Sequence, residues 1–270
     1  MFDGVQCPCI LLQLVATGKP LSTVGMRIED RTRTFIIAME RTVVPENFSF
    51  RMTDEEYRVL EKIKNSIPVC YLADHADFAL GIVTGNNKKF LSAEKTEHSE
   101  MVLKGTDICK YHINPAKQYL RFEPEQFQQV APLEIYRAPE KLLYRFISNQ
   151  LVVAYDDRQM LSLNSCNIVI PKIEGMQIKY ILAILNSSVS QFVYQKEFHS
   201  IKVLRAHMEH IPIPRVGKAI QNEIIAMTEP LICGMGKEAA ETCQKRLDCR
   251  IMDLFRFSAE EQWIIRHALH

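Results

Sequence analysis

The chain has 270 residues, of which 47% are hydrophobic and 24% are charged, and its formal net charge is +1. This composition is typical of a folded globular protein with one large or two modest cores, and it excludes a disordered chain. The longest apolar runs fall well short of the roughly 20 residues that cross a bilayer, and no export signal begins the chain. We therefore expect a cytoplasmic protein without a membrane partner.

The eight cysteines are scattered along the chain, which predicts free thiols instead of a disulfide framework. Cys7 and Cys9 form a close pair, but their spacing differs from that of a zinc knuckle and no second half matches it. We assign no metal to them.

Two apolar runs near the start predict strands, at residues 10–15 and 34–38. Strands this apolar are normally buried in a sheet of several members, so we expect the start of the chain to be the tail of a larger domain. A helix follows, capped by Thr53 with Glu56 three residues later, and it ends near Pro68.

Residues 69–136 predict irregular strands and loops, with a Gly- and Asn-rich turn at residues 84–87 that two lysines follow. Residues 141–171 predict a three-strand meander, with strands at 142–147, 151–155 and 167–170 and a turn at 156–158. The acidic pair Asp156-Asp157 could hold Mg²⁺, but a simple turn explains it as well.

The stretch 180–214 predicts an apolar helix that reaches Asn186 and then a basic segment, which Pro212 and Pro214 end. Residues 137–218 hold 11 Lys and Arg against 6 Asp and Glu, an excess of +5. This excess indicates either a solvated face or a phosphate-binding surface. Two further helical regions follow, separated at residues 233–236, and Ser258 with Glu261 predicts the start of a last helix.

Several catalytic signatures are absent from the sequence. The one Gly-x-Gly, at residues 234–236, follows a helix and not a strand, and there is no Asn-Pro-Pro or Asp-Pro-Pro loop that could grip an extruded base. No acidic residue has a lysine two positions later, and no nucleophile elbow, His-Glu-x-x-His helix or phosphate loop occurs. His207 and His210 are three apart, but no third metal ligand accompanies them.

The order of several short motifs resembles the C-terminal specificity region of bacterial TaqI-like adenine-specific DNA methyltransferases, which also occurs in type II restriction-modification enzymes. The matching pieces are ALGIVTGNN at 79–87, LKGTDICKY at 103–111, KLLYRFISNQLVVAYDD at 141–157, LAILNSSVSQFVY at 182–194 and IPIP at 211–214. Residues 247–265 are similar to the helical ending of these proteins, and FDGVQCPCILLQLV resembles the late strand of their methyltransferase domain.

The resemblance implies an α+β fold: a mixed, mostly antiparallel target-recognition domain with C-terminal helices, preceded by a remnant of a methyltransferase sheet. It divides the chain into a Rossmann-like tail at 1–66, a DNA target-recognition domain at 67–217 and a helical segment at 218–270. It implies that this chain alone is not an active enzyme, and that S-adenosylmethionine binds to a separate catalytic domain. The implied partners are double-stranded DNA and a methyltransferase domain or subunit.

Phosphate contacts need cations, and base reading needs side chains with paired donors and acceptors. The candidates for DNA phosphate are Lys88, Lys89, Lys104, Lys110, Lys196, Lys202 and Arg205, and the candidates for DNA bases are Asn86, Asn87, Arg158, Asn164 and Asn167. We expect Asn186 and Ser187 to be structural. Salt-sensitive duplex binding should weaken when Lys196, Lys202 and Arg205 are replaced by alanine.

Two other functions fit the sequence. The chain could be a protein-interaction module that docks onto a separate methyltransferase subunit through the strands at 9–16 and 34–38 and the terminal helices, with no DNA affinity of its own. It could also be a small-molecule enzyme with an unrecognised site, which a deep pocket with convergent ionisable groups would indicate.

Overall fold

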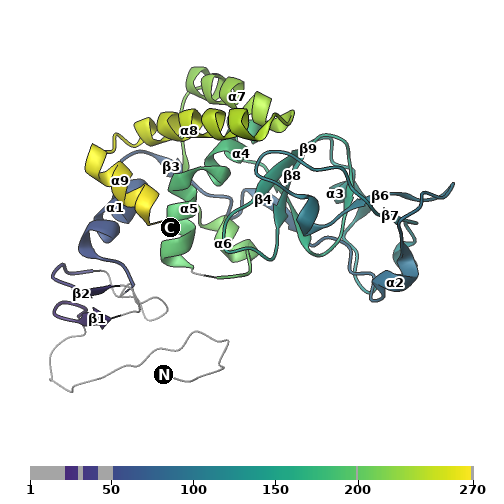
Figure 1. Cartoon of the computed structure of the whole chain (residues 1–270), viewed down its shortest axis with the longest axis horizontal. Helices are drawn as coiled ribbons and strands as arrows, with labels where there is room; N and C mark the ends of the chain where they lie inside the picture. The colour runs from purple at the N-terminus through teal and green to yellow at the C-terminus, as the bar shows by residue number, and fades with distance from the viewer. Residues whose placement is uncertain (1–21, 30–32, 42–50, 199, 269–270) are drawn as a thin grey trace. The chain divides into compact units, whose positions relative to one another are not determined.

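A computed structural model describes residues 22–29, 33–41, 51–198 and 200–268 of the chain. The chain divides into two compact units, residues 1–53 and 54–270 (Figure 1). The contacts divide the chain between Thr53 and Asp54, and the predicted domain boundaries at residues 66 and 217 stay predictions. The predicted strand at residues 10–15 and the pair Cys7 and Cys9 lie outside the described residues.

In the first unit, strands β1 (Arg27–Glu29) and β2 (Thr34–Ile36) pair antiparallel, with Arg27 opposite Ile36. The predicted strand at 34–38 is thus present but shorter, and its partner at 27–29 was not predicted. Ile37 is fully buried, whereas Ile36 is 63% exposed. Whether this hairpin belongs to a methyltransferase sheet stays a prediction.

The second unit combines helices with short strands. Its helices are α1 (Asp54–Asn65), α2 (Asn87–Phe90), α3 (Leu133–Tyr136), α4 (Ile178–Asn186), α5 (Ser188–Glu197), α6 (Arg205–Glu209), α7 (Lys218–Ile232), α8 (Lys237–Leu254) and α9 (Ala259–His267). Its strands are β3 (Val69–Cys70), β4 (Ala76–Ala79), β5 (Leu91–Ser92), β6 (Glu100–Leu103), β7 (Tyr119–Leu120), β8 (Lys141–Arg145), β9 (Val153–Asp156), β10 (Leu161–Ser162), β11 (Cys166–Pro171) and β12 (Ile213–Pro214).

The main sheet has the antiparallel order β4-β11-β8-β9. The three strands predicted between 142 and 170 are all present, but they do not form a meander, because β11 pairs with β8 and not with β9. The segment between β9 and β11 instead forms β10, which pairs parallel to β6. This crossing joins the main sheet to a second sheet of order β10-β6-β7-β5.

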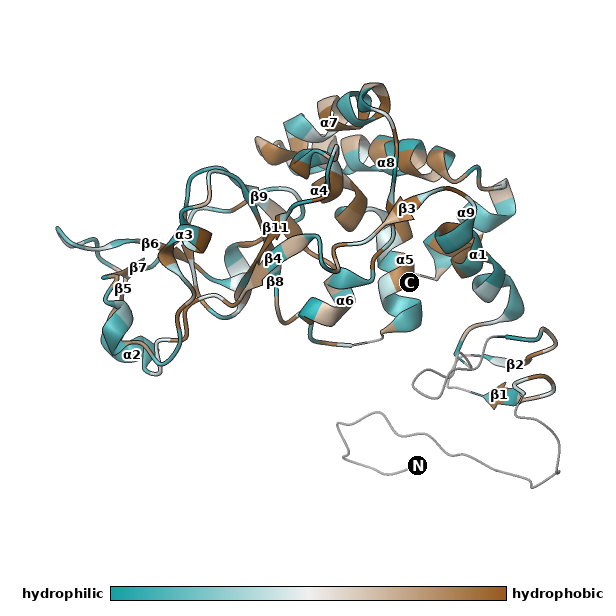
Figure 2. Cartoon of the chain, turned by 180° about the vertical axis from the view of Figure 1, so that it is seen from behind, coloured by the Kyte–Doolittle hydropathy of each residue, from teal (hydrophilic) through white to brown (hydrophobic). Residues whose placement is uncertain are grey.

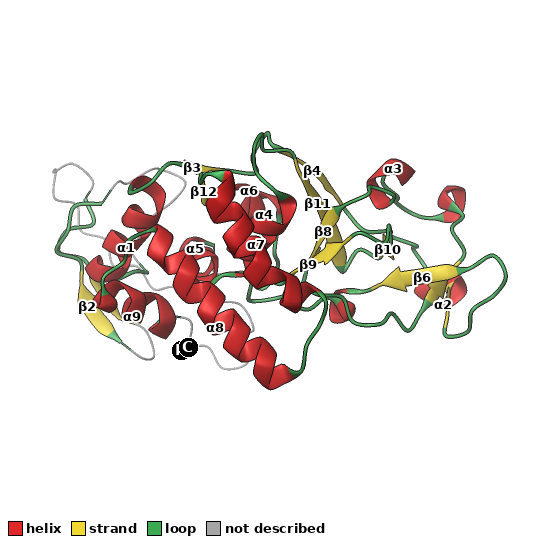
Figure 3. Cartoon of the chain, turned by 90° about the horizontal axis from the view of Figure 1, so that it is seen from above, coloured by secondary structure: helices red, strands yellow, loops and turns green. Residues whose placement is uncertain are grey.

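The two sheets share one apolar core. Leu143, Ala154 and Ile168 from the main sheet belong to the same buried cluster as Val102 and Leu120 from the second sheet. In Figure 3 the main sheet lies between the long helices and the part of the unit that holds β6, α2 and α3. The mixed, mostly antiparallel α+β fold expected from the sequence is confirmed.

Two glycines let the chain backbones cross closely where the two sheets meet. A Cβ atom at Gly81 would lie 2.1 Å from the carbonyl oxygen of Leu163, and one at Gly105 would lie 2.5 Å from that of Ser165. These distances are shorter than any van der Waals contact, so only glycine fits at either position. The loop at 163–165 is therefore held directly against residues 81 and 105.

Helices α4 and α5 form the buried centre of the helical part. Figure 2 shows α4 as largely hydrophobic, and its residues from Tyr180 to Asn186 are all buried. In α5 the residues from Ser188 to Tyr194 are buried as well. The hydroxyl and amide groups of this segment are therefore buried, and they are not part of the basic segment predicted after Asn186.

The side chain of Asn186 joins the helices to the main sheet. Its Oδ1 accepts a hydrogen bond from the Val153 amide at 3.1 Å, and its Nδ2 donates to the Val153 carbonyl at 2.8 Å. Ser187 ends α4 by donating to the Ile184 carbonyl at 2.7 Å, and it caps α5 by accepting from the Ser190 amide. The predicted structural role of Asn186 and Ser187 is confirmed.

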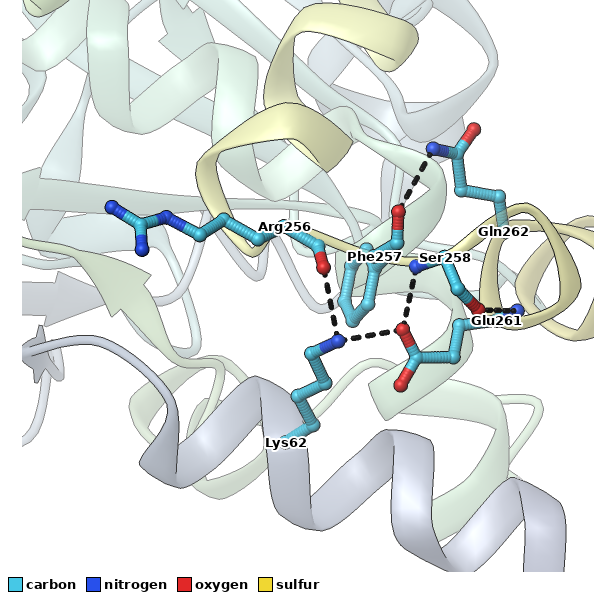
Figure 4. Close-up of polar contacts among 6 residues, drawn as sticks. All are labelled: Lys62, Arg256, Phe257, Ser258, Glu261 and Gln262. Carbon is cyan, nitrogen blue, oxygen red and sulfur yellow. Dashed lines mark hydrogen bonds and ion pairs between the residues drawn. The ribbon is translucent and has the colours of Figure 1, made fainter.

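Helix α1 packs against the C-terminal helices and against α5. Figure 4 shows Lys62, whose Nζ lies 2.6 Å from Oε2 of Glu261 and 3.0 Å from the carbonyl oxygen of Arg256. Ser258 and Glu261 form the predicted reciprocal cap at the start of α9, with hydrogen bonds of 3.2 and 2.7 Å. These contacts are the physical reason that residues 54–65 belong to the second unit. Among the described residues no helix has the length and apolar character of a membrane span.

Replacing Gly81 with alanine should destabilise the protein by about 1–3 kcal/mol or more, because the new methyl group would overlap the Leu163 backbone. Urea unfolding followed by circular dichroism would measure the loss. Gly217→Ala is the matched control, since nothing lies within 4 Å of its added Cβ. Equal stability of the two variants would contradict the close crossing.

Replacing Asn186 with alanine should cost about 1–3 kcal/mol, because it leaves the buried amide of Val153 without its partner, while the Val153 carbonyl keeps only the Tyr111 amide at 2.7 Å. The exposed Asn149→Ala serves as the control. The midpoint of urea unfolding should fall for the first variant and stay near that of the parent protein for the second.

Candidate nucleic-acid interface

Three loops that are distant in the sequence meet at one end of the second unit. The Ile82 amide donates to the Ser162 carbonyl at 2.7 Å, and the Asn164 amide donates to the Ile82 carbonyl at 3.1 Å. The Leu163 amide donates to the Leu103 carbonyl at 2.8 Å. The chain after residue 82, the chain after residue 103 and the loop at 163–165 are therefore fixed to one another through their backbones.

A fourth segment joins this group through a pair of backbone hydrogen bonds between Val83 and Gln129, at 2.9 and 3.0 Å. Residues from three of these segments line an open hollow of about 250 Å³. It is lined by Val83, Thr84, Gly85, Asn87, Gln128 and Asn164. None of these six residues is ionisable, so the hollow offers neutral hydrogen-bonding groups and no acid–base chemistry.

The turn beside the hollow is built by its own polar side chains. Thr84 Oγ1 donates to Asn87 Oδ1 at 2.6 Å, and Asn86 Oδ1 accepts from the Lys89 amide at 3.2 Å as the cap of α2. This leaves the NH₂ groups of both asparagines at an exposed turn. Lys88 and Lys89 follow on α2, and both are exposed.

Three of the predicted phosphate contacts lie on segments that line the hollow or are bonded to its lining segments. Lys88 and Lys89 directly follow Asn87, and Lys89 Nζ lies 3.3 Å from Oε1 of Gln126. Lys104 precedes Gly105, whose amide donates to Ser165 Oγ at 3.0 Å. Lys88 and Lys89 therefore come from a segment that lines the hollow, whereas Lys104 comes from a segment that is bonded to the loop at 163–165 beside it.

Lys110 and Lys196, in contrast, are engaged inside the protein. Lys110 Nζ donates to the Asn186 carbonyl at 3.2 Å, and burial lowers the pKa of its ammonium group. Lys196 Nζ lies 2.8 Å from Oε1 of Glu56, and both side chains are 11% exposed. Removing a buried, paired charge is costly, so we no longer expect these two lysines to contact phosphate.

Asn167, which was predicted to contact a DNA base, is buried. The residue is 2% exposed, and its Oδ1 accepts from the Gly81 amide at 3.4 Å. A buried side chain cannot reach a base edge. The prediction for Asn167 is therefore replaced by a structural role beside the Gly81 crossing.

The remaining candidates are exposed but do not line the hollow. Lys202 is exposed, and Arg205 pairs with Glu209 at 2.7 Å and lies 5.2 Å from the ring centre of Phe78. Arg158 is exposed in the turn after β9. Their contacts with DNA stay predictions.

The other polar residues considered in the sequence have internal partners. Asp156 is buried against Lys141 at 2.6 Å, and its carboxylate also accepts from the Arg158 and Met160 amides, which confirms the turn. His207 Nδ1 accepts from the Leu204 amide at 3.2 Å. His199 lies outside the described residues.

Sequence reasoning missed Gln128 altogether. It lies in the loop after Phe127, which has no motif and no strand pattern, and it reaches the hollow only because Gln129 pairs with Val83. That pairing joins residues 46 positions apart, and no local signal in the sequence predicts it.

Comparison with known proteins gave one family match. Residues 100–213 match the model of the TaqI-like C-terminal specificity domain. This range holds 114 of the 270 residues, and it includes Lys104, Gln128 and Asn164. None of the curated proteins with which the chain was compared matches it.

Among solved structures, the chain is similar to the type IIL restriction-modification enzyme MmeI in complex with DNA, with a TM-score of 0.49 and 11% identity, over 74% of this chain and 36% of that one. It is also similar to the HsdS subunit from Thermoanaerobacter tengcongensis, with a TM-score of 0.39 and 13% identity, over 80% of this chain and 50% of that one. The similarity to a chain from a type I restriction-modification system has a TM-score of 0.43 and 12% sequence identity. It covers 80% of this chain and 52% of that one.

These structural likenesses are weak, and the chain spans from about a third to about half of the proteins concerned. The assignment therefore rests on the family match. That match confirms the resemblance carried by the motifs at 103–111, 141–157, 182–194 and 211–213. Residues 100–213 of this chain are thus similar to a TaqI-like C-terminal specificity domain.

Proposed function

We propose that this protein recognises a sequence in double-stranded DNA as the specificity part of an adenine-specific DNA methyltransferase or restriction-modification enzyme. The observation that carries the proposal is the family match over residues 100–213, because this segment supplies Lys104, Gln128 and Asn164 at the end of the unit where the loops meet. Duplex recognition needs cations that hold phosphate and neutral polar groups that read bases, and both kinds are present there.

Catalysis would belong to another domain or subunit, which would bind S-adenosylmethionine and transfer the methyl group. The hollow supports this division, since its lining has no ionisable residue. A protein that recognises sequences in bacterial DNA acts in the cytoplasm, which is the location we propose for this protein.

A second candidate is docking onto a separate methyltransferase subunit without DNA affinity. One observation favours it: Trp263 on the terminal helix α9 is 58% exposed. An exposed tryptophan is common at protein interfaces. Co-purification with such a subunit, combined with no binding of the isolated chain to duplex DNA, would support this candidate over the first.

The triple variant Lys88→Ala, Lys89→Ala, Lys104→Ala should bind duplex DNA more weakly at every sequence. The slope of log affinity against log salt should fall by roughly one for each lysine that contacts phosphate. Fluorescence anisotropy with labelled duplexes, measured from low to moderate salt, gives both quantities.

The matched control is Lys218→Ala, Lys237→Ala, Lys245→Ala, which removes the same charge from exposed positions of α7 and α8. It should leave the salt slope close to that of the parent protein. If both triple variants lose the same slope, the lysines beside the hollow are not the phosphate contacts. If the folded parent chain binds no duplex even at low salt, the proposed function is wrong.

A further inference from the structure

Asn87, Gln128 and Asn164, which each carry a carboxamide, line the hollow from three separate segments. Gln128 and Asn164 are exposed, and their side chains have no hydrogen-bond partner within the described residues. Side chains that stabilise a loop normally bond to its backbone, as Asn86 does. The amides of Gln128 and Asn164 are therefore unused by the fold and free to meet a ligand.

Gly85 keeps the hollow open beneath Gln128. Its φ angle is +75°, and a Cβ atom built on it would lie 3.4 Å from Cβ and 3.6 Å from Oε1 of Gln128. The Gln128 side chain thus lies over a residue that has no side chain of its own. A larger residue at position 85 would crowd the carboxamide and would strain the backbone.

The lining suits a base edge better than a phosphate, because a base edge can use both the donors and the acceptors of a carboxamide, whereas a phosphate can use the donors alone. A carboxamide offers one acceptor oxygen and two donor hydrogens, whereas a phosphate only accepts. The oxygens of Gln128 and Asn164 would find no donor on a phosphate, but they match the exocyclic amino group of a base. The nearby cations, Lys88 and Lys89, are outside the lining and suit the phosphates on either side.

We propose that the hollow reads one base-pair edge in the major groove, that Gln128 and Asn164 are its specificity-determining residues, and that adenine is the base it favours. Asn and Gln carboxamides pair with the N6 and N7 atoms of adenine through two hydrogen bonds. Asn87 adds a donor, because its Oδ1 is occupied by Thr84. This inference rests on the proposed DNA recognition and names the residues and the base that it uses.

The test is selection of bound sequences from a pool of random duplexes by the full chain, followed by affinity measurements on the selected site and on its single-base variants. Gln128→Ala should reduce discrimination at one position of the site by roughly 5- to 150-fold, the range given by a single bidentate contact. The salt slope should stay unchanged, because no phosphate contact is removed.

Gln128→Glu provides a more specific test of the base contact, since this variant keeps the shape of the side chain but leaves only acceptor oxygens. A glutamate accepts from the N4 amino group of cytosine, so the preferred base at that position should change from adenine to cytosine. Gln150→Ala and Gln150→Glu are the matched controls, because Gln150 is an exposed glutamine that does not line the hollow. They should leave every position of the selected site unchanged.

If the parent chain selects a site and both Gln128 variants select the same one with the same discrimination, the inference is wrong while DNA recognition stands. If the affected position prefers a base other than adenine in the parent chain, the assignment of adenine is wrong. A parent chain that binds no duplex overturns the proposed function itself and this inference with it.

Discussion

The close crossing of backbones at Gly81 and Gly105 is the constraint on which the arrangement of the loops depends. Because neither position can carry a side chain, the loop at 163–165 lies directly on the two segments it crosses. The backbone hydrogen bonds of Ile82 and Leu103 then fix the position of this loop relative to both segments. These backbone contacts hold the loops as a defined surface, which is what the proposed recognition of duplex DNA requires.

A second junction connects this surface to the helical part. Asn186 ends α4 and bonds to both backbone groups of Val153 on β9, so the last turn of the helix is bonded directly to the edge of the main sheet. Lys110 adds to the same junction through the Asn186 carbonyl. A polar network that is satisfied on every side specifies one arrangement of helix and sheet, whereas apolar packing alone tolerates several.

The sequence was sufficient for the features that are set locally. The helix at 54–65, the cap at Ser258 and the cap at Ser187 each depend on residues close together in the chain, and all are as predicted. Asn186 is structural as predicted, but its partner Val153, 33 residues away, was not predicted. The pairing of β11 with β8 and the place of Gln128 depend on contacts between distant segments, which leave no local pattern. Charge alone also misled, since Lys110 and Lys196 look like surface cations until their internal partners are known.

The free side chains of Gln128 and Asn164 have a consequence for how this protein can change over evolutionary time. Substitution at these positions alters what the surface can bind and removes no bond that the fold needs. Substitution at Gly81, Gly105 or Asn186 does the opposite. Under the proposed function, one or two exchanges at these positions would change the target at little cost in stability and would leave the framework that presents them unchanged.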